Sequence, residues 1–241
     1  CILSSFTIKG CELVARSFHL PPKFIKSGQH WSGYERQLIT QIARMLKCKL
    51  TFVEVPWARA LNLIKSGELD ILMGVYANDQ RAMDYYLIGP YDVEKSVLLV
   101  KRNRKISITS LEDIADSRYL IARETKGWYG EAFQKLMRAN VKFSRRLVSV
   151  AGYSQKINML RTGRVDAVIE NQDIARYRSL TDSSYQRFKI LSFTLFEAPV
   201  FMALTKKRNA LFRDQMVEVT NKVLSNDGYK NLKQHYFSPK N

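Results

Sequence analysis

The sequence predicts an α/β protein made of two similar lobes, each a mainly parallel sheet flanked by helices. Two observations carry this prediction. Short apolar runs alternate with helix-period segments along most of the 241 residues, which is typical of parallel strands joined by covering helices. One unit of helix end, glycine and apolar strand also occurs twice, at 63–73 and 159–169, with its glycines 96 residues apart. That spacing is about the size of one α/β lobe.

The first lobe is expected to begin as strand, helix, strand, helix, strand. The expected strands cover 13–18, 50–55 and 69–73, and the expected helices cover 33–47 and 57–66. Pro56 stands just before the second helix, which is a favoured start. Gly67 is a natural C-cap, because glycine takes the left-handed conformation without a Cβ clash. A polar, irregular connection is expected at 74–81.

A second α/β series follows the break at Gly89-Pro90-Tyr91. Its expected strands cover 96–101, 119–122, 147–150 and 165–169, and its helices cover 129–138 and 154–161, with a further helix start at 110–113. Strands near 188–191 and at 199–205 lead to terminal helices at 210–224 and 229–236. These last helices need an apolar surface, and the first lobe is the expected host.

The first lobe is therefore expected to be discontinuous. We expect lobe 1 to comprise 1–94 plus 198–241 and lobe 2 to comprise 95–197, joined by a hinge near 91–96 and 193–199. A cleft between lobes is the usual place for a small ligand.

Charge and composition exclude several classes of protein. The net charge is +17, but the 39 Lys and Arg residues are spread along the chain without aromatic interleaving, so we expect no nucleic-acid partner. No apolar stretch approaches the roughly 20 residues needed to cross a bilayer. The chain starts at Cys1, for which a lipid-bearing processed terminus and an arbitrary start both stay open.

Cys11 and Cys48 each precede a predicted strand. If those strands pair in parallel, the two Cα atoms lie about 5 Å apart, within reach of a disulfide. The alternative is two buried thiols.

Several short motifs together carry a resemblance to a known family. They are Leu20-Pro21-Pro22-Lys23-Phe24, Gly33-Tyr34-Glu35, the segment from Trp57 to Asp70, the loop from Gly74 to Arg81, Pro90-Tyr91, Gly127-Trp128-Tyr129, and Gly163-Arg164-Val165-Asp166-Ala167. In this order they resemble the bacterial extracellular solute-binding proteins of family 3, the amino-acid-binding type that serves ABC transporters. The resemblance implies a type II periplasmic-binding fold, hinge closure on a small carboxylate ligand, a periplasmic location and an ABC permease as partner. We expect a monomer without a cofactor.

The resemblance also implies ligand-binding residues in the first lobe. A guanidinium forms a planar fork for a carboxylate, and the family uses the arginine that matches Arg81 for the ligand's α-carboxylate. The alternative is a surface arginine paired with Asp79 or Asp84. Trp57 takes the place of a ring that stacks on ligands. The remaining first-lobe candidates, for which packing roles stay open, are His19, Phe24, Tyr76 and Asn78.

The second lobe departs from the family pattern. Trp128 and Tyr129 follow Gly127 where the family has Ser or Thr, although backbone N–H groups there can still bind an anion. Asn171 replaces the aspartate that takes the α-ammonium. Either Glu170 or Asp173 supplies the missing charge, or the ligand is not an ordinary α-amino acid. If strand alternation persists through this point, Glu170 faces the opposite side.

No catalytic motif is present, and the histidines His19, His30 and His235 lack metal-ligand spacing. We therefore expect no enzyme and no metal site. Two alternatives stay open. One is a dehydratase acting on cyclic carboxylates, with Glu170 or Asp173 as general acid. The other is the sensing domain of a receptor.

Overall fold

Three strands that pair in parallel form the base of the first lobe. The computed structural model describes residues 10–225 and 227–238. The strands are β1 (Glu12–Ser17), β4 (Lys49–Glu54) and β5 (Ile71–Tyr76), and the helices between and after them are α1 (Tyr34–Met45), α2 (Trp57–Ser66) and α3 (Asp79–Asp84). β1 pairs in parallel with both β4 and β5. A small hairpin of β2 (Ile25–Ser27) and β3 (His30–Ser32) precedes α1.

The second lobe repeats this plan. Its strands are β7 (Ile121–Glu124), β8 (Leu147–Val150) and β9 (Ala167–Asn171), and its helices are α4 (Leu111–Asp116), α5 (Glu131–Ala139), α6 (Val141–Arg145), α7 (Tyr153–Thr162) and α8 (Gln172–Thr181), followed by a 3-10 turn, η1 (Ser183–Arg187). β7 pairs in parallel with β8 on one side and β9 on the other.

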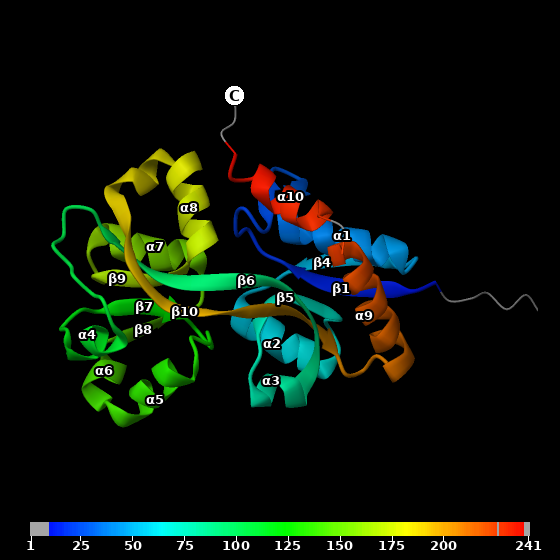
Figure 1. Ribbon diagram of the computed structural model, residues 1–241, viewed down its shortest axis with the longest axis horizontal. Coiled ribbons are helices and arrows are strands. Elements are labelled where there is room, and N and C mark those ends of the chain that lie inside the picture. Colours follow the sequence, from blue (N-terminus) through cyan, green and yellow to red (C-terminus); the bar gives the residue numbers. More distant parts are fainter. Residues whose placement is uncertain (1–9, 226, 239–241) are drawn as a thin grey trace, which may run out of the picture.

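Two long strands run through both lobes. β6 (Tyr85–Lys101) and β10 (Phe188–Thr205) pair antiparallel, from Tyr85↔Thr205 to Lys101↔Phe188. They join the two groups of strands into one sheet with the order β4-β1-β5-β10-β6-β9-β7-β8. Figure 1 shows this pair crossing the middle of the molecule, with α4 to α8 on one side and α1 to α3 on the other. The α/β architecture predicted from the sequence is confirmed.

The sequence prediction divided each long strand into pieces, and this was wrong. Gly89 and Pro90 were expected to lie in a break between secondary-structure elements, yet they lie inside β6. Its pairing with β10 is irregular there, since the register shifts between Val200↔Asp92 and Met202↔Ile88. A proline has no backbone N–H to donate, and an irregularity in the ladder is where a sheet tolerates it.

The C-terminal helices pack on the first lobe. They are α9 (Ala210–Ser225) and α10 (Gly228–His235). Met216 of α9 and Tyr229 of α10 belong to the same buried cluster as Leu13 of β1 and Ile42 of α1. The first lobe comprises β1 to β5, α1 to α3, α9 and α10, and the second lobe comprises α4 to α8 and β7 to β9.

Both glycines of the repeated unit have the predicted C-cap role. α2 ends at Gly67 with φ 88°, and α7 ends at Gly163 with φ 80°. Both values lie in the left-handed region that glycine enters without steric cost. Each glycine is followed by a strand, β5 or β9, that leads to the interior of the molecule.

Cys11 and Cys48, for which the sequence left a disulfide and two buried thiols open, form a disulfide. The cysteines lie at the start of the β1–β4 pair, with Cα atoms 4.5 Å apart. The bridge closes a loop over a sequence separation of 37 residues and should contribute about 2–4 kcal/mol to stability through the unfolded chain. The lipid anchor considered for Cys1 lies outside the described residues. Over residues 10–225 and 227–238, no helix has the length and apolar character needed to span a bilayer.

Candidate functional site

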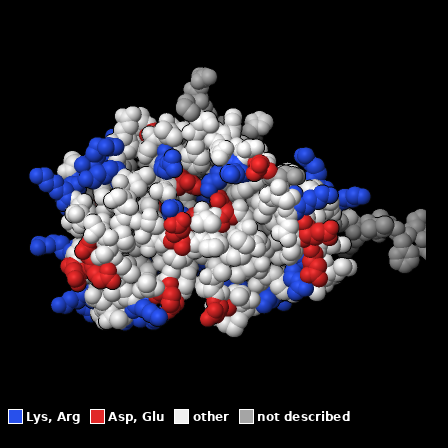
Figure 2. Space-filling model, in the orientation of Figure 1, with Lys and Arg blue, Asp and Glu red and all other residues white. Residues whose placement is uncertain are grey.

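A cavity of about 170 Å³ lies among residues of both lobes and of β6. Nine of the eleven site residues predicted from sequence line it. They are Phe24, Trp57, Tyr76, Arg81, Gly127, Trp128, Tyr129, Glu170 and Asn171. On the face shown in Figure 2, Asp and Glu side chains gather near the middle of the molecule, while Lys and Arg dominate its outer edge.

Arg81 lies buried at the cavity wall, in α3 just beyond β5. Its Nη1 donates to the carbonyl oxygen of Tyr76 at 2.8 Å, and its guanidinium lies 5.8 Å from the ring centre of Trp57. Burial lowers the pKa of Arg81, and nearby Tyr85 and Tyr76 partly offset this effect. The expected surface alternative is wrong, because Asp84 pairs with Lys65 at 2.7 Å. Within the described residues, no carboxylate forms an ion pair with Arg81.

Asn78 is not among the lining residues. It caps α3 instead, since its Oδ1 accepts a hydrogen bond from the backbone N–H of Arg81 at 2.9 Å. The connection expected to be irregular at 74–81 is therefore partly helical. A capping asparagine satisfies one of the free N–H groups at a helix start, and here it also holds Arg81 at the end of β5.

His19 is also absent from the cavity lining. Its Nδ1 accepts a hydrogen bond from the backbone N–H of Lys26 at 3.0 Å. Partial burial and the nearby Arg178 lower the pKa of His19. It stabilises the loop after β1 rather than facing the cavity.

A buried cluster of charges, which sequence analysis did not assign, lines the cavity through Lys23, Glu35 and Glu94. Lys23 Nζ pairs with Glu35 Oε1 at 2.9 Å and also with Glu94 Oε1. Tyr91 donates to Glu35 at 2.8 Å, and Tyr76 donates to Glu94 Oε2 at 3.0 Å. Burial by itself lowers the pKa of Lys23, but the two carboxylates more than offset this and raise it. The signal was present, because Lys23 and Glu35 stand inside two of the quoted motifs.

Asn171 has no free acceptor for a ligand ammonium group, because both lone pairs of its Oδ1 are used within the protein. Its Oδ1 accepts from the backbone N–H groups of Asp173 and Ile174, at 2.9 and 3.2 Å, as the N-cap of α8. Its Nδ2 donates to Glu94 Oε2 at 2.8 Å. Asp173 is not at the cavity, since it pairs with Lys233 at 2.8 Å. Asp173 therefore does not supply the charge that is missing at position 171.

Glu170 lines the cavity, although strand alternation predicted the opposite orientation. The prediction was wrong because the strand ends there: Asn171 already caps α8, so regular alternation does not continue through it. Glu170 is buried, with Oε1 accepting from the backbone N–H of Asn171 at 2.9 Å. Its Oε2 lies 3.3 Å from Nζ of Lys156.

The turn after β7 is closed by Tyr129. Its hydroxyl accepts from the backbone N–H of Glu124 at 3.0 Å, and the N–H of Gly127 donates to the carbonyl of Glu124 at 3.0 Å. A Cβ added at Gly127 would lie 2.7 Å from the Tyr129 hydroxyl oxygen. The N–H of Gly127 is thus used within the turn, and Tyr129 occupies space beside it. Among the described residues, no cluster of three or more His, Cys, Asp or Glu is placed to hold a metal ion.

Comparison with known proteins agrees with this geometry. A sequence profile of the bacterial extracellular solute-binding proteins, family 3, matches residues 14–239, and the chain belongs to that family. It is 24% identical over 173 residues to the L-cystine-binding protein TcyJ of Escherichia coli K12, covering 70% of this chain and 61% of the relative. It is 22% identical over 159 residues to the L-cystine-binding protein TcyA of Bacillus subtilis, covering 66% of this chain and 55% of the relative.

Solved structures show the same fold at low identity. An ancestral arginine-binding protein bound to glutamine has a TM-score of 0.80 at 19% identity, with 96% of this chain and 100% of that chain covered. A histidine kinase sensor domain similar to periplasmic binding proteins has a TM-score of 0.80 at 16% identity, with 95% and 96% covered. The ancestral amino-acid-binding protein AncCDT-1, a precursor of cyclohexadienyl dehydratase, has a TM-score of 0.75 at 19% identity, with 94% and 96% covered. The predicted type II periplasmic-binding fold is confirmed.

Proposed function

We propose that this chain is an extracytoplasmic solute-binding protein that captures a small carboxylate-bearing ligand, an amino acid or a related compound, for an ABC permease. Membership of family 3 supports the class of protein. The carboxylate assignment is carried by one observation. Arg81 is a buried cation at the wall of the cavity, and the described residues offer it no carboxylate. A ligand carboxylate would supply the missing anion through the planar fork of the guanidinium.

The proposed mechanism is closure of the two lobes around the ligand. The ligand docks on Arg81 and Trp57 in the first lobe, and the second lobe, taken as residues 95–197, then closes over it. Segments near 91–96 and 193–199, within β6 and β10, act as the hinge between this lobe and residues 1–94 plus 198–241. Closure requires that the shut form bind the ligand more tightly than the open form does. The protein would act as a periplasmic monomer without turnover.

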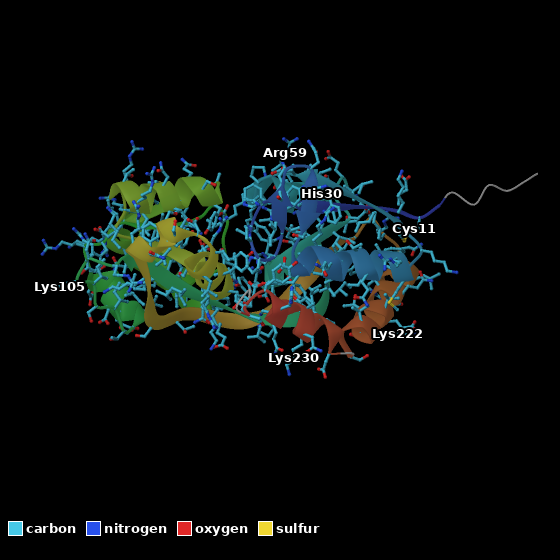
Figure 3. The ribbon with its side chains drawn as sticks, turned by 90° about the horizontal axis from the view of Figure 1, so that it is seen from above. Cys11, His30, Arg59, Lys105, Lys222 and Lys230 are labelled. Atoms are coloured by element: carbon cyan, nitrogen blue, oxygen red, sulfur yellow. A yellow bond between two sulfur atoms is a disulfide. The ribbon has the colours of Figure 1, made fainter. Side chains whose placement is uncertain are left out.

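Arg81→Ala should abolish ligand binding. In a thermal-shift screen of the twenty L-amino acids and L-cystine, wild-type protein should gain about 3 kcal/mol of stability at a ligand concentration near 100 times Kd. The variant should gain none, because the carboxylate loses its bidentate partner. Arg59→Ala is the matched control, since Arg59 is an exposed arginine of α2, labelled in Figure 3. Tight binding retained by Arg81→Ala would contradict the role of Arg81.

One structural observation supports each of two alternative functions. The fold is shared with a sensor domain, and adjacent genes for a permease and an ATPase, rather than a kinase region in the same gene, would favour transport. It is also shared with a precursor of a dehydratase, and Glu170 at the cavity is an acidic group of the kind that reaction needs. Turnover of prephenate or arogenate would replace the binding proposal with an enzymatic one.

A further inference from the structure

Two glutamates of the second lobe meet at the cavity. β7 and β9 pair in parallel, with Ile121 beside Ala167 and Ala122 beside Val168. Glu124 and Glu170 each stand two residues after the last of these pairs, at the carboxyl ends of the two strands, and, besides burial, repulsion from Glu170 contributes to the raised pKa of Glu124. Both residues line the cavity.

The pair is only half neutralised by the protein. Lys156 is the one cation within 4 Å of either carboxylate in the described part of the chain, at 3.3 Å from Glu170 Oε2. Its Nζ directs a hydrogen bond elsewhere, to the carbonyl oxygen of Ile169 at 2.8 Å. Glu170 Oε2 is buried, and no described group is placed to give it a hydrogen bond. Glu124, Glu170 and Lys156 together carry a net charge of −1 when all three are ionised.

Arg16, a cation of the first lobe that acts on Glu124, forms no ion pair within 4 Å in the described part of the chain and has other contacts. Arg16 donates Nε to the carbonyl oxygen of Val55 at 2.9 Å, and its guanidinium lies over the rings of Phe18 and Trp57. Burial raises the pKa of Glu124, and Lys156 and Arg16 act in the opposite direction. An additional cation beside the Glu124 carboxylate would offset the cost of its burial.

We propose that Glu124 and Glu170 form a subsite for an ammonium group of the ligand, so that the ligand is an amino carboxylate. This inference rests on the proposed function, because it places the ligand's carboxylate on Arg81. It moves the ammonium site away from position 171, where Asn171 has both ends of its amide engaged within the protein. A primary ammonium has three N–H donors and can bond to both carboxylates at once.

In this arrangement the first lobe binds the carboxylate of the ligand and the second lobe binds its ammonium group. Arg81 belongs to the first lobe, and the two glutamates belong to β7 and β9 of the second lobe. A zwitterion would bridge opposite charges across the cavity and favour the closed form. A carboxylate without an amino group would bind Arg81 alone.

The test compares matched pairs of probes by calorimetric titration. The probes are L-alanine, L-leucine, L-glutamine and L-phenylalanine, each set against the acid that lacks its amino group: propionate, 4-methylpentanoate, glutaramate and 3-phenylpropionate. Wild-type protein should bind at least one amino acid about tenfold or more tightly than its partner acid, since a hydrogen bond to a charged group is worth that much. This comparison needs no variant.

Glu124→Gln should then lower the affinity for that amino acid about tenfold and change the affinity for the partner acid by less than about threefold. Glu170→Gln should act in the same direction. Glu131→Gln, an exposed glutamate of α5 paired with Arg138, is the control and should change neither affinity.

The outcomes separate the two proposals. Equal binding of amino acids and partner acids would overturn the ammonium subsite and leave the proposed function standing. An amino-acid preference that survives both Glu124→Gln and Glu170→Gln would place the ammonium elsewhere and also overturn it. Binding of neither set would contradict the proposed function and, with it, this inference.

Discussion

At the scale of single residues, some charges of the site lie against opposite charges, while Arg16, Arg81 and Glu124 form no ion pair among the described side chains. Lys23 is held between Glu35 and Glu94, and Lys156 lies against Glu170. Arg81 and Glu124 have no such partner among the described side chains. Buried charges cost free energy unless they are paired. Pairing with Arg81 and with Glu124 would therefore contribute most to the free energy of ligand binding.

Asn171→Asp should destabilise the protein rather than restore the amino-acid-binding pattern of the family. An aspartate still caps α8, but it loses the N–H donor to Glu94 Oε2 and sets a second carboxylate beside it. We expect a loss of about 1–3 kcal/mol in the free energy of unfolding, measured by denaturant titration. Asn140→Asp, at the N-cap of α6, is the matched control and should be close to neutral. Unchanged stability together with tighter amino-acid binding would show that position 171 does hold the ammonium.

Sequence analysis found the residues whose role follows from local spacing and missed those whose role depends on contacts across the chain. Arg81 follows β5 at the distance that the motif predicts, and it lines the cavity. Glu94 meets Lys23, 71 residues away, only because β6 passes beneath the loop after β1. Glu124 acquires its place near Glu170 from the register of β7 and β9. No local pattern in the sequence predicts that Glu94 lies beside Lys23 or that Glu124 lies near Glu170.

At the scale of elements, α10 connects the two lobes through one lysine. Lys233 Nζ lies 2.6 Å from Asp92 Oδ2 on β6 and 2.8 Å from Asp173 Oδ2 on α8. Tyr236, just after α10, packs near Tyr177 of α8 with ring centres 6.4 Å apart. The C-terminal helix therefore contacts the second lobe as well as the first.

Lys233→Met should lower the free energy of unfolding by about 1–3 kcal/mol at pH 7, because two partly buried carboxylates lose their shared cation. Burial lowers the pKa of Lys233, but Asp173 and Asp92 more than offset this and raise it above 10.5. A raised pKa means that the stabilisation is complete below pH 10.5 and is lost as the pH rises through the folded-state pKa. The difference between variant and wild type should shrink in that alkaline range.

Lys230→Met is the control for this prediction, because Lys230 is an exposed lysine on the same helix, labelled in Figure 3. Equal unfolding midpoints for the two variants would contradict a stabilising role for Lys233.

The elements themselves were largely predictable, with one class of exception. Helices and strands that stand alone in the chain, such as α1, α2 and α9, have their own periodicity and end signals. β6 and β10 looked interrupted because Pro90 and the polar residues at 192–198 break the local pattern. Each is continuous because the other strand supplies hydrogen-bond partners along its length.

At the scale of the whole molecule, the fold places a cation of the first lobe and an anionic pair of the second lobe on one cavity. The only strands shared by the lobes are β6 and β10, within the described part of the chain. In the proposed mechanism, a ligand that carries both charges would favour the closed form through its differential affinity for that form. The chain's large positive charge, +17, also attracts anionic solutes to the protein before they bind.

The central claim is that a small amino carboxylate is captured by closure of the lobes. Small-angle X-ray scattering in solution, with and without the amino acid that binds most tightly in calorimetry, tests it directly. We predict that the radius of gyration falls when the ligand is present at saturation, and that Arg81→Ala shows no such fall. An unchanged radius of gyration for wild-type protein saturated with a tightly bound ligand would contradict the claim.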